Sequence, residues 1–125
     1  MHTQDHDAVR GIADAYLNAV YQGDAITLAT LFDPNAQVYG EIDGQPYFKT
    51  AAFYVEGVAA RRSPLQLGEP YAMQVLAIDQ LGEIASIKLH SPMLGFNYHL
   101  YLTVRRVDGE WLIVNKTFTH LAASA

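Results

Sequence analysis

The chain has 125 residues, a formal net charge of −5 and no cysteine. Without cysteine it forms no disulfide, uses no thiolate nucleophile and holds no cysteine-ligated zinc. Its eight lysines and arginines do not gather into a basic stripe, so nucleic acid is not expected as a partner. No apolar run approaches the roughly 20 residues that span a bilayer, and the polar N-terminus is unlike a signal peptide. We therefore expect one cytoplasmic domain, residues 1–125, with no membrane partner.

Helices are predicted in the first half of the chain. Apolar residues recur at helical spacing over about residues 5–22 and place Tyr16 on the buried stripe. Gly23 is expected to end this helix, and Asp24 to cap a second, short helix that stops before Pro34. A third helix is expected after Thr50, over about residues 51–61.

Strands are predicted around and after the third helix. Residues 36–42 form one expected strand, which a turn at residues 43–44 leads back toward Tyr47. Two further strands are expected over residues 71–79 and 84–90, the second ending at Ser91-Pro92. A sequence of helices followed by a mostly antiparallel sheet is typical of α+β proteins. We expect a cone: a strongly bent sheet with about three helices on its concave face and a pocket between them.

The final hairpin, from Tyr98 to His120, turns at Asp108-Gly109, where both turn residues need a positive φ. A two-residue turn predicts the register: Leu102 pairs with Asn115, and Leu100 pairs with Thr117. Two faces follow from the alternation of side chains. The expected pocket face carries Leu100, Leu102, Val104, Trp111, Ile113, Asn115 and Thr117. The expected outer face is half apolar, which predicts a homodimer through Tyr101, Thr103, Val114, Lys116 and Phe118.

Three stretches of the chain resemble one superfamily: YLNAVYQGD at Tyr16–Asp24, LFDPNA at Leu31–Ala36, and VDGEWLIVNKTF at Val107–Phe118. They are similar to the nuclear-transport-factor-2-like superfamily, which includes ketosteroid isomerase, scytalone dehydratase and SnoaL-like polyketide cyclases. The third stretch is most similar to the subgroup named "putative lumazine-binding". The resemblance covers essentially the whole chain and implies a cystatin-like α+β fold, but this fold hosts many chemistries and many binding proteins.

The resemblance to these enzymes can be followed residue by residue. Tyr16 matches the tyrosine that donates a hydrogen bond to the enolate oxygen in ketosteroid isomerase. The position of the catalytic base falls at Gly40, next to Glu41, and the second acid falls near Leu100 or Leu102, where no carboxylate stands. A reaction of the scytalone-dehydratase type would need a histidine beside an aspartate. Strand histidines are candidates for that role: His90, His99 and His120.

The sequence therefore predicts a protein that binds a small apolar or aromatic molecule without a cofactor or metal. Tyr16, Asn115 and Thr117 are the expected polar contacts, and Leu100, Leu102, Trp111 and Ile113 the expected wall. Three further tyrosines are within reach of the pocket: Tyr39, Tyr54 and Tyr98. Two alternatives stay open. One is a cofactor-free isomerase, dehydratase or cyclase acting through Tyr16 and Glu41 or a histidine, and the other is a dimeric protein-interaction module.

Overall fold

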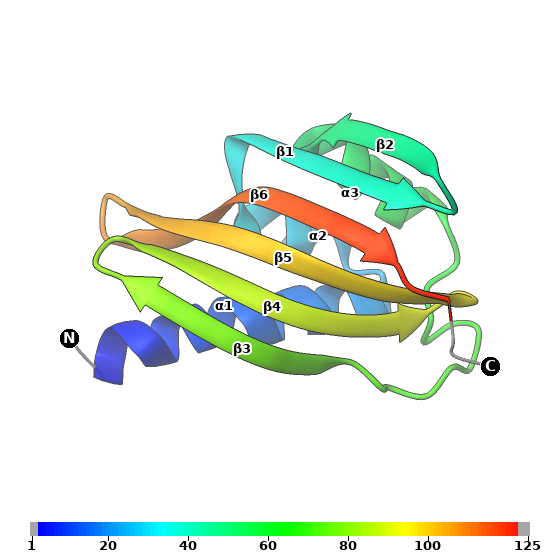
Figure 1. Cartoon of the computed structure of the whole chain (residues 1–125), viewed down its shortest axis with the longest axis horizontal. Helices are drawn as coiled ribbons and strands as arrows, with labels where there is room; N and C mark the ends of the chain where they lie inside the picture. The colour runs from blue at the N-terminus through cyan, green and yellow to red at the C-terminus, as the bar shows by residue number, and fades with distance from the viewer. Residues whose placement is uncertain (1–2, 123–125) are drawn as a thin grey trace.

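The computed structural model describes residues 3–122 and shows three helices against one face of a six-stranded sheet (Figure 1). The strand order is β2-β1-β6-β5-β4-β3, in which β1 and β6 are parallel and all other neighbours are antiparallel. The elements are α1 (Thr3–Gln22), α2 (Ala25–Leu31), β1 (Phe32–Ile42), β2 (Gln45–Thr50), α3 (Ala51–Ala60), β3 (Gln74–Leu81), β4 (Ile84–Met93), β5 (Phe96–Val107) and β6 (Glu110–His120). The predicted α+β class is confirmed.

The helix boundaries follow the local signals. Gly23 adopts a φ of 72° after α1, a left-handed conformation that glycine reaches without steric cost. The Asp24 side chain accepts a hydrogen bond from the backbone N–H of Thr27 at 3.1 Å, which caps α2. Thr50 caps α3 in the same way, accepting from the N–H of Phe53 at 3.2 Å. No helix in the described residues is long and apolar enough to span a membrane.

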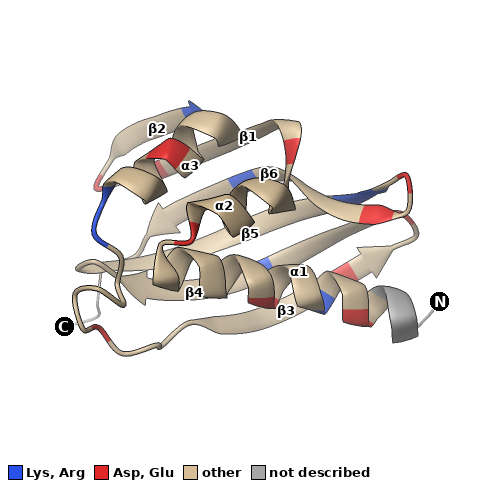
Figure 2. Ribbon diagram, turned by 180° about the vertical axis from the view of Figure 1, so that it is seen from behind, with Lys and Arg blue, Asp and Glu red and all other residues tan. Residues whose placement is uncertain are grey.

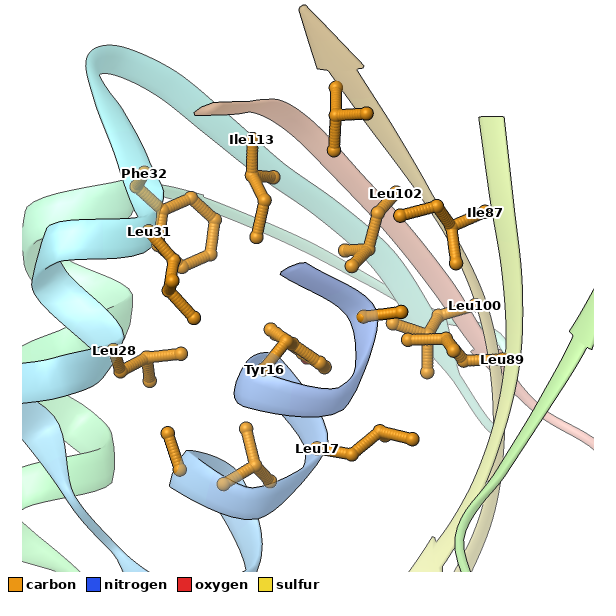
Figure 3. Close-up of a cluster of buried hydrophobic side chains, with 14 of the residues drawn as sticks. Tyr16, Leu17, Leu28, Leu31, Phe32, Ile87, Leu89, Leu100, Leu102 and Ile113 are labelled. Atoms are coloured by element: carbon orange, nitrogen blue, oxygen red, sulfur yellow. The ribbon is translucent and has the colours of Figure 1, made fainter. Parts of the chain in front are cut away.

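The core lies between α1 and the concave face of the sheet. Figure 3 shows Tyr16 of α1 between Leu28 of α2 and Leu100 of β5. Tyr16 is only 1% exposed, so the helix side of the core contains a buried phenol group. A buried hydroxyl needs a hydrogen-bond partner, so the polar part of the core is expected beside the Tyr16 hydroxyl.

Strand β4 is longer than predicted. It continues through Ser91-Pro92 to Met93, where the strand was expected to end at His90. Its pairing with β3 stops at His90, so Pro92 pairs only with Asn97 of β5. A proline lacks the N–H that a second neighbour would need, and such one-sided pairing tolerates it. The inward alternation along β4 therefore extends to Ser91, whose side chain is buried.

The register of the β5–β6 hairpin is correct only near the turn. Asp108 and Gly109 adopt φ values of 50° and 84°, and Val104 pairs with Ile113 as predicted. The register then shifts by one residue between Thr103 and Val104, so that Leu102 pairs with Lys116 rather than with Asn115. Such an irregularity moves the side chains in the rest of β6 to the opposite face of the sheet from the predicted one.

Candidate functional site

A cavity of about 80 Å³ lies between the helices and the sheet. Its wall contains aromatic and apolar side chains together with a few polar groups, and its half-buried members are Ile42, Tyr47, Arg61 and Tyr98. It is smaller than the apolar cavity of about 150 Å³ that takes up a whole benzene molecule, so it encloses a small organic group or one end of a larger molecule and not a steroid. The lining residues are Tyr16, Ile42, Tyr47, Tyr54, Arg61, Ser91, Met93, Tyr98, Leu100, Lys116 and Phe118.

A short chain of hydrogen bonds crosses the cavity wall. The Nζ atom of Lys116 on β6 donates to the hydroxyl of Tyr54 on α3 at 2.9 Å. The hydroxyls of Tyr54 and Tyr16 are hydrogen-bonded at 3.3 Å. All three side chains are buried. The chain thus joins α1, α3 and β6 through polar atoms at the centre of the core.

Lys116 lies in an aromatic cage. Its Nζ atom is 4.1 Å from the ring centre of Tyr54, 5.1 Å from that of Phe118 and 5.5 Å from that of Tyr16. Aromatic faces attract a cation, which offsets part of the cost of burying one. Burial nevertheless dominates and lowers the pKa of Lys116, although the adjacent Tyr54 opposes this change.

Tyr16 and Tyr54, the two tyrosines joined by a hydrogen bond, differ in acidity. Burial raises the pKa of Tyr16 well above its usual value, and the neighbouring Tyr54 raises it further. Burial alone would also raise the pKa of Tyr54, but the charge and hydrogen bond of Lys116 outweigh it, and the pKa of Tyr54 is lowered. The phenol of Tyr16 therefore holds its proton more tightly than the phenol of Tyr54.

Two more polar side chains of the cavity wall have hydrogen-bonding groups without a partner. The Nε and Nη2 atoms of Arg61, at the C-terminal end of α3, are buried and make no hydrogen bond within the described part of the chain. The same is true of the Ser91 hydroxyl, on a side chain that is 2% exposed. Figure 2 shows basic residues on the segment that follows α3 and on β6.

The structure brings only part of the predicted site together. Tyr16 and Leu100 line the cavity, and of the three further tyrosines Tyr54 and Tyr98 do so. Three wall residues of the prediction are buried in the core without lining the cavity: Leu102, Trp111 and Ile113. The predicted register had placed Asn115 and Thr117 inside, which is wrong. Thr117 is exposed and donates a hydrogen bond to Asn115 Oδ1 at 2.7 Å, and Lys116 and Phe118 face the cavity instead.

The enzyme candidates on β1 are also outside the cavity wall. Glu41 is exposed, and its carboxylate accepts hydrogen bonds from the backbone N–H of Gly44 and from the Thr119 hydroxyl. The Gly44 hydrogen bond is the main cause that lowers the pKa of Glu41. Gly40 faces inward, and the ring of Phe118 fills the space that a side chain there would need. A carboxylate at position 40 would thus have no room, and the carboxylate of Glu41 lies outside the cavity wall.

The strand histidines lie away from the cavity wall as well. His90 stacks on His99 with ring centres 4.4 Å apart, and its Nε2 atom is 2.6 Å from Asn97 Oδ1. His120 accepts a hydrogen bond from the Asn97 N–H at 2.9 Å. Among the described residues, those that line the cavity include neither a histidine nor a carboxylate. Its chemistry rests instead on hydroxyls, one amine and one guanidinium.

Sequence reasoning missed Arg61, Ser91 and Lys116 as site residues. For Ser91 the signal was present, because the inward alternation of Ala85, Ile87 and Leu89 continues to it if the strand is extended. For Arg61 and Lys116 no local pattern indicates the cavity. Their positions depend on where α3 ends and on the irregularity in β6.

Solved structures with the same fold share little sequence with this chain. Proteins described as NTF2-like and of unknown function come from Shewanella baltica (TM-score 0.86, 17% identity, 98% of each chain), Methylobacillus flagellatus (0.84, 20%, 98% of this chain and 96% of the other) and Silicibacter pomeroyi (0.81, 21%, 97% and 100%). At these identities the likeness establishes the fold. A comparison with curated proteins gives no match.

The sequence comparison is more specific than the structural one. Residues 4–119 match the family described as "Putative lumazine-binding", which covers nearly all of the described chain. The curved sheet, its helices and the solved neighbours agree with that match. The chain therefore belongs to the family described as "Putative lumazine-binding".

Proposed function

We propose that the protein binds a small, partly apolar or aromatic molecule in the cavity between α1, α3 and the sheet. The observation that carries the proposal is a cavity lined by aromatic side chains that also contains polar groups without partners. Ligand sites combine an apolar lining with a few polar groups in this way. The family description supports a small ligand, but nothing in the cavity singles out lumazine.

Native mass spectrometry of freshly purified protein tests the proposal. We expect a defined small-molecule adduct on each protomer, released on collisional activation. The variant Leu100→Trp fills the cavity and should lose the adduct, whereas Leu112→Trp, a half-buried position on β6 outside the cavity wall, should keep it. Circular dichroism checks that both variants fold. An unmodified mass, together with no thermal stabilisation by any member of an aromatic metabolite library, would contradict the proposal.

We further propose a homodimer through the outer face of the sheet. Two of the five residues first expected on this face, Lys116 and Phe118, lie inside. The face nevertheless exposes Tyr101, 53% accessible, and a contacting pair on β1 and β2, Tyr39 and Phe48, with ring centres 4.8 Å apart. Exposed aromatic side chains of this kind are common at protein interfaces.

Light scattering at several concentrations tests the dimer. Tyr101→Glu should shift the mass from dimer to monomer, because a charge placed opposite its own copy repels it. Ile26→Glu is the matched control, since Ile26 is 84% exposed on α2, on the helical side of the molecule. A wild-type mass that equals the monomer at every concentration would contradict the dimer. The same measurement tests the alternative function, a module that binds a different protein chain. That function needs this face to be free of a second copy.

A further inference from the structure

We propose that the ligand of this cavity carries a carboxylate, bound by the guanidinium of Arg61 and the hydroxyl of Ser91, with Lys116 supplying a second positive charge. This inference rests on the proposed function and names the class of ligand. It follows from which atoms of the cavity wall lack partners and from the charge that surrounds them.

The free atoms of Arg61 are the first observation. Nε and Nη2 lie along one edge of the guanidinium, and their N–H bonds point in the same direction. Both atoms are buried, and neither has a hydrogen-bond partner among residues 3–122. Two parallel donors at this spacing match the two oxygens of a carboxylate, which accept a bidentate pair of hydrogen bonds. The backbone N–H of Arg61 is already used, because it donates to the carbonyl of Gly57 at 3.2 Å.

Ser91 is an independent second observation. It lies on β4 of the sheet rather than at the end of α3, and its buried hydroxyl likewise has no partner in the described chain. A buried hydroxyl without a partner is costly, and such groups in native proteins usually serve a ligand or a water molecule. A donor on α3 and a donor on the sheet thus line the same space.

The charge of the cavity selects an anion. Lys116 and Arg61 both line it, and no described acidic residue does. The positive charge of Arg61 also acts on other residues of the wall. Burial is the main influence on the pKa of Tyr47 and Tyr98 and raises both, whereas Arg61 lowers the pKa in each case. This arrangement occurs in a chain whose net charge is −5. A neutral ligand would leave the two buried cations without a counter-charge, which is unfavourable in a medium of low polarity.

The remaining wall describes the rest of the ligand. Leu100, Met93 and Phe118 are apolar, and the half-buried lining residues Ile42, Tyr47 and Tyr98 lie beside them in the wall. An apolar or aromatic body beside the carboxylate would bury surface against these side chains. The class is therefore a small monocarboxylic acid with an apolar or aromatic body. The competing occupant is a group of water molecules, which would give no preference between a carboxylate and its neutral amide.

Titration calorimetry with matched pairs of probes tests the proposal. The pairs are benzoate with benzamide and isobutyrate with isobutyramide, with phenyl phosphate as a second anion. We expect each carboxylate to bind at least about tenfold more tightly than its amide, the effect of a hydrogen bond to a charged group. Arg61→Gln should remove this preference. Arg62→Gln should keep it, because Arg62 is the next residue, exposed, and also close to the end of α3.

A stability measurement separates ligand binding from a structural role. Ser91→Ala removes a hydroxyl that has no partner, so it should leave the melting temperature of the free protein unchanged or higher while weakening carboxylate binding several-fold. A clear fall in the melting temperature of the free protein would show that Ser91 serves the fold and overturn its assignment.

The binding outcomes distinguish the two proposals. Equal affinity for acids and amides would overturn the carboxylate and leave small-molecule binding intact. Tighter binding of phenyl phosphate than of benzoate would also overturn it. Absence of binding by every probe would contradict the carboxylate inference, while an adduct in native mass spectrometry would still uphold the proposed function. A preference for carboxylates that Arg61→Gln retains would show that the anion binds elsewhere and overturn the site.

Discussion

Replacing Gly40 by alanine is expected to destabilise the protein by about 2–3 kcal/mol, the upper part of the range for overpacking a core. A Cβ atom at this position would lie 2.6 Å from Cδ1 of Phe118 and closer still to two other carbons of the ring. Carbon atoms pack at about 3.5–4.0 Å, so the ring has to move. The glycine is required here by this close approach, not by its backbone conformation.

Phe118 has little freedom to make room. Its ring packs edge-on against Tyr47 and Tyr98, with ring centres at 5.1 and 5.7 Å, and the side chain is 8% exposed. Lys116 Nζ lies 5.1 Å from the ring centre on the cavity side. The ring can move chiefly into the cavity, so Gly40→Ala should weaken ligand binding as well as stability.

Chemical denaturation measures the effect, with Gly57→Ala as the control. A Cβ at Gly57 would meet nothing within 4 Å, and the residue lies in α3, where alanine stabilises a helix by about 0.5–1 kcal/mol relative to glycine. In a protein that already carries Phe118→Leu, Gly40→Ala should cost less stability than it does in the wild type, because the smaller side chain leaves space for the added Cβ atom. If Gly40→Ala is as stable as the wild type, the packing of Phe118 against Gly40 is wrong.

The contact between Gly40 and Phe118 also limits the chemistry of the site. In ketosteroid isomerase the position that corresponds to Gly40 carries the base, and here an aromatic ring fills that space. Glu41, one residue on, points to the other face and holds the turn through Gly44. The departure from the ketosteroid isomerase pattern thus coincides with close core packing at Gly40.

Local signals in the sequence were sufficient for most of the fold. Gly23, Asp24 and Thr50 mark helix ends because each acts on the backbone within three residues. Asp108-Gly109 fixes the hairpin turn for the same reason. Tyr16 was identified as a buried polar residue by helical spacing, since one face of α1 packs on the sheet.

The candidate site depends on features that are not local. One irregularity in β6 exchanged Asn115 and Thr117 for Lys116 and Phe118, and a lysine between two polar residues indicates a surface position in the sequence. Ser91 was lost because a proline after it suggests the end of a strand, whereas one-sided pairing lets β4 continue. These outcomes follow from tertiary contacts, which pattern reasoning does not contain.

Replacing Lys116 by methionine is expected to stabilise the ligand-free protein by about 1–4 kcal/mol at neutral pH, the range seen when buried ionic groups are replaced by apolar ones. The substitution removes a buried amine of similar length without leaving a partner unsatisfied. Tyr54 keeps its hydrogen bond to Tyr16. The aromatic cage that surrounds Lys116 suits a thioether as well as an ammonium.

The pH dependence of this effect has a definite sign. Burial lowers the pKa of Lys116 in the folded protein below the unfolded value of 10.5. Between the folded and the unfolded pKa, the unfolded chain binds more protons, so the stability of the wild type rises with pH through that interval. Below the folded pKa the full cost of the buried charge applies. The advantage of Lys116→Met should therefore be larger at about pH 7 than at about pH 10.

Denaturation at about pH 7 and about pH 10 measures both quantities. Lys88→Met is the control, because Lys88 is exposed on β4 and its removal should change stability little at either pH. Absorbance titration of the tyrosinates adds a separate readout. The Lys116 ammonium is what brings the pKa of Tyr54 below its usual value against the effect of burial, so Lys116→Met should raise that pKa. A less stable Lys116→Met protein with an unchanged Tyr54 titration would mean that the amine is not buried beside Tyr54. That result would contradict the hydrogen bond between Lys116 and Tyr54.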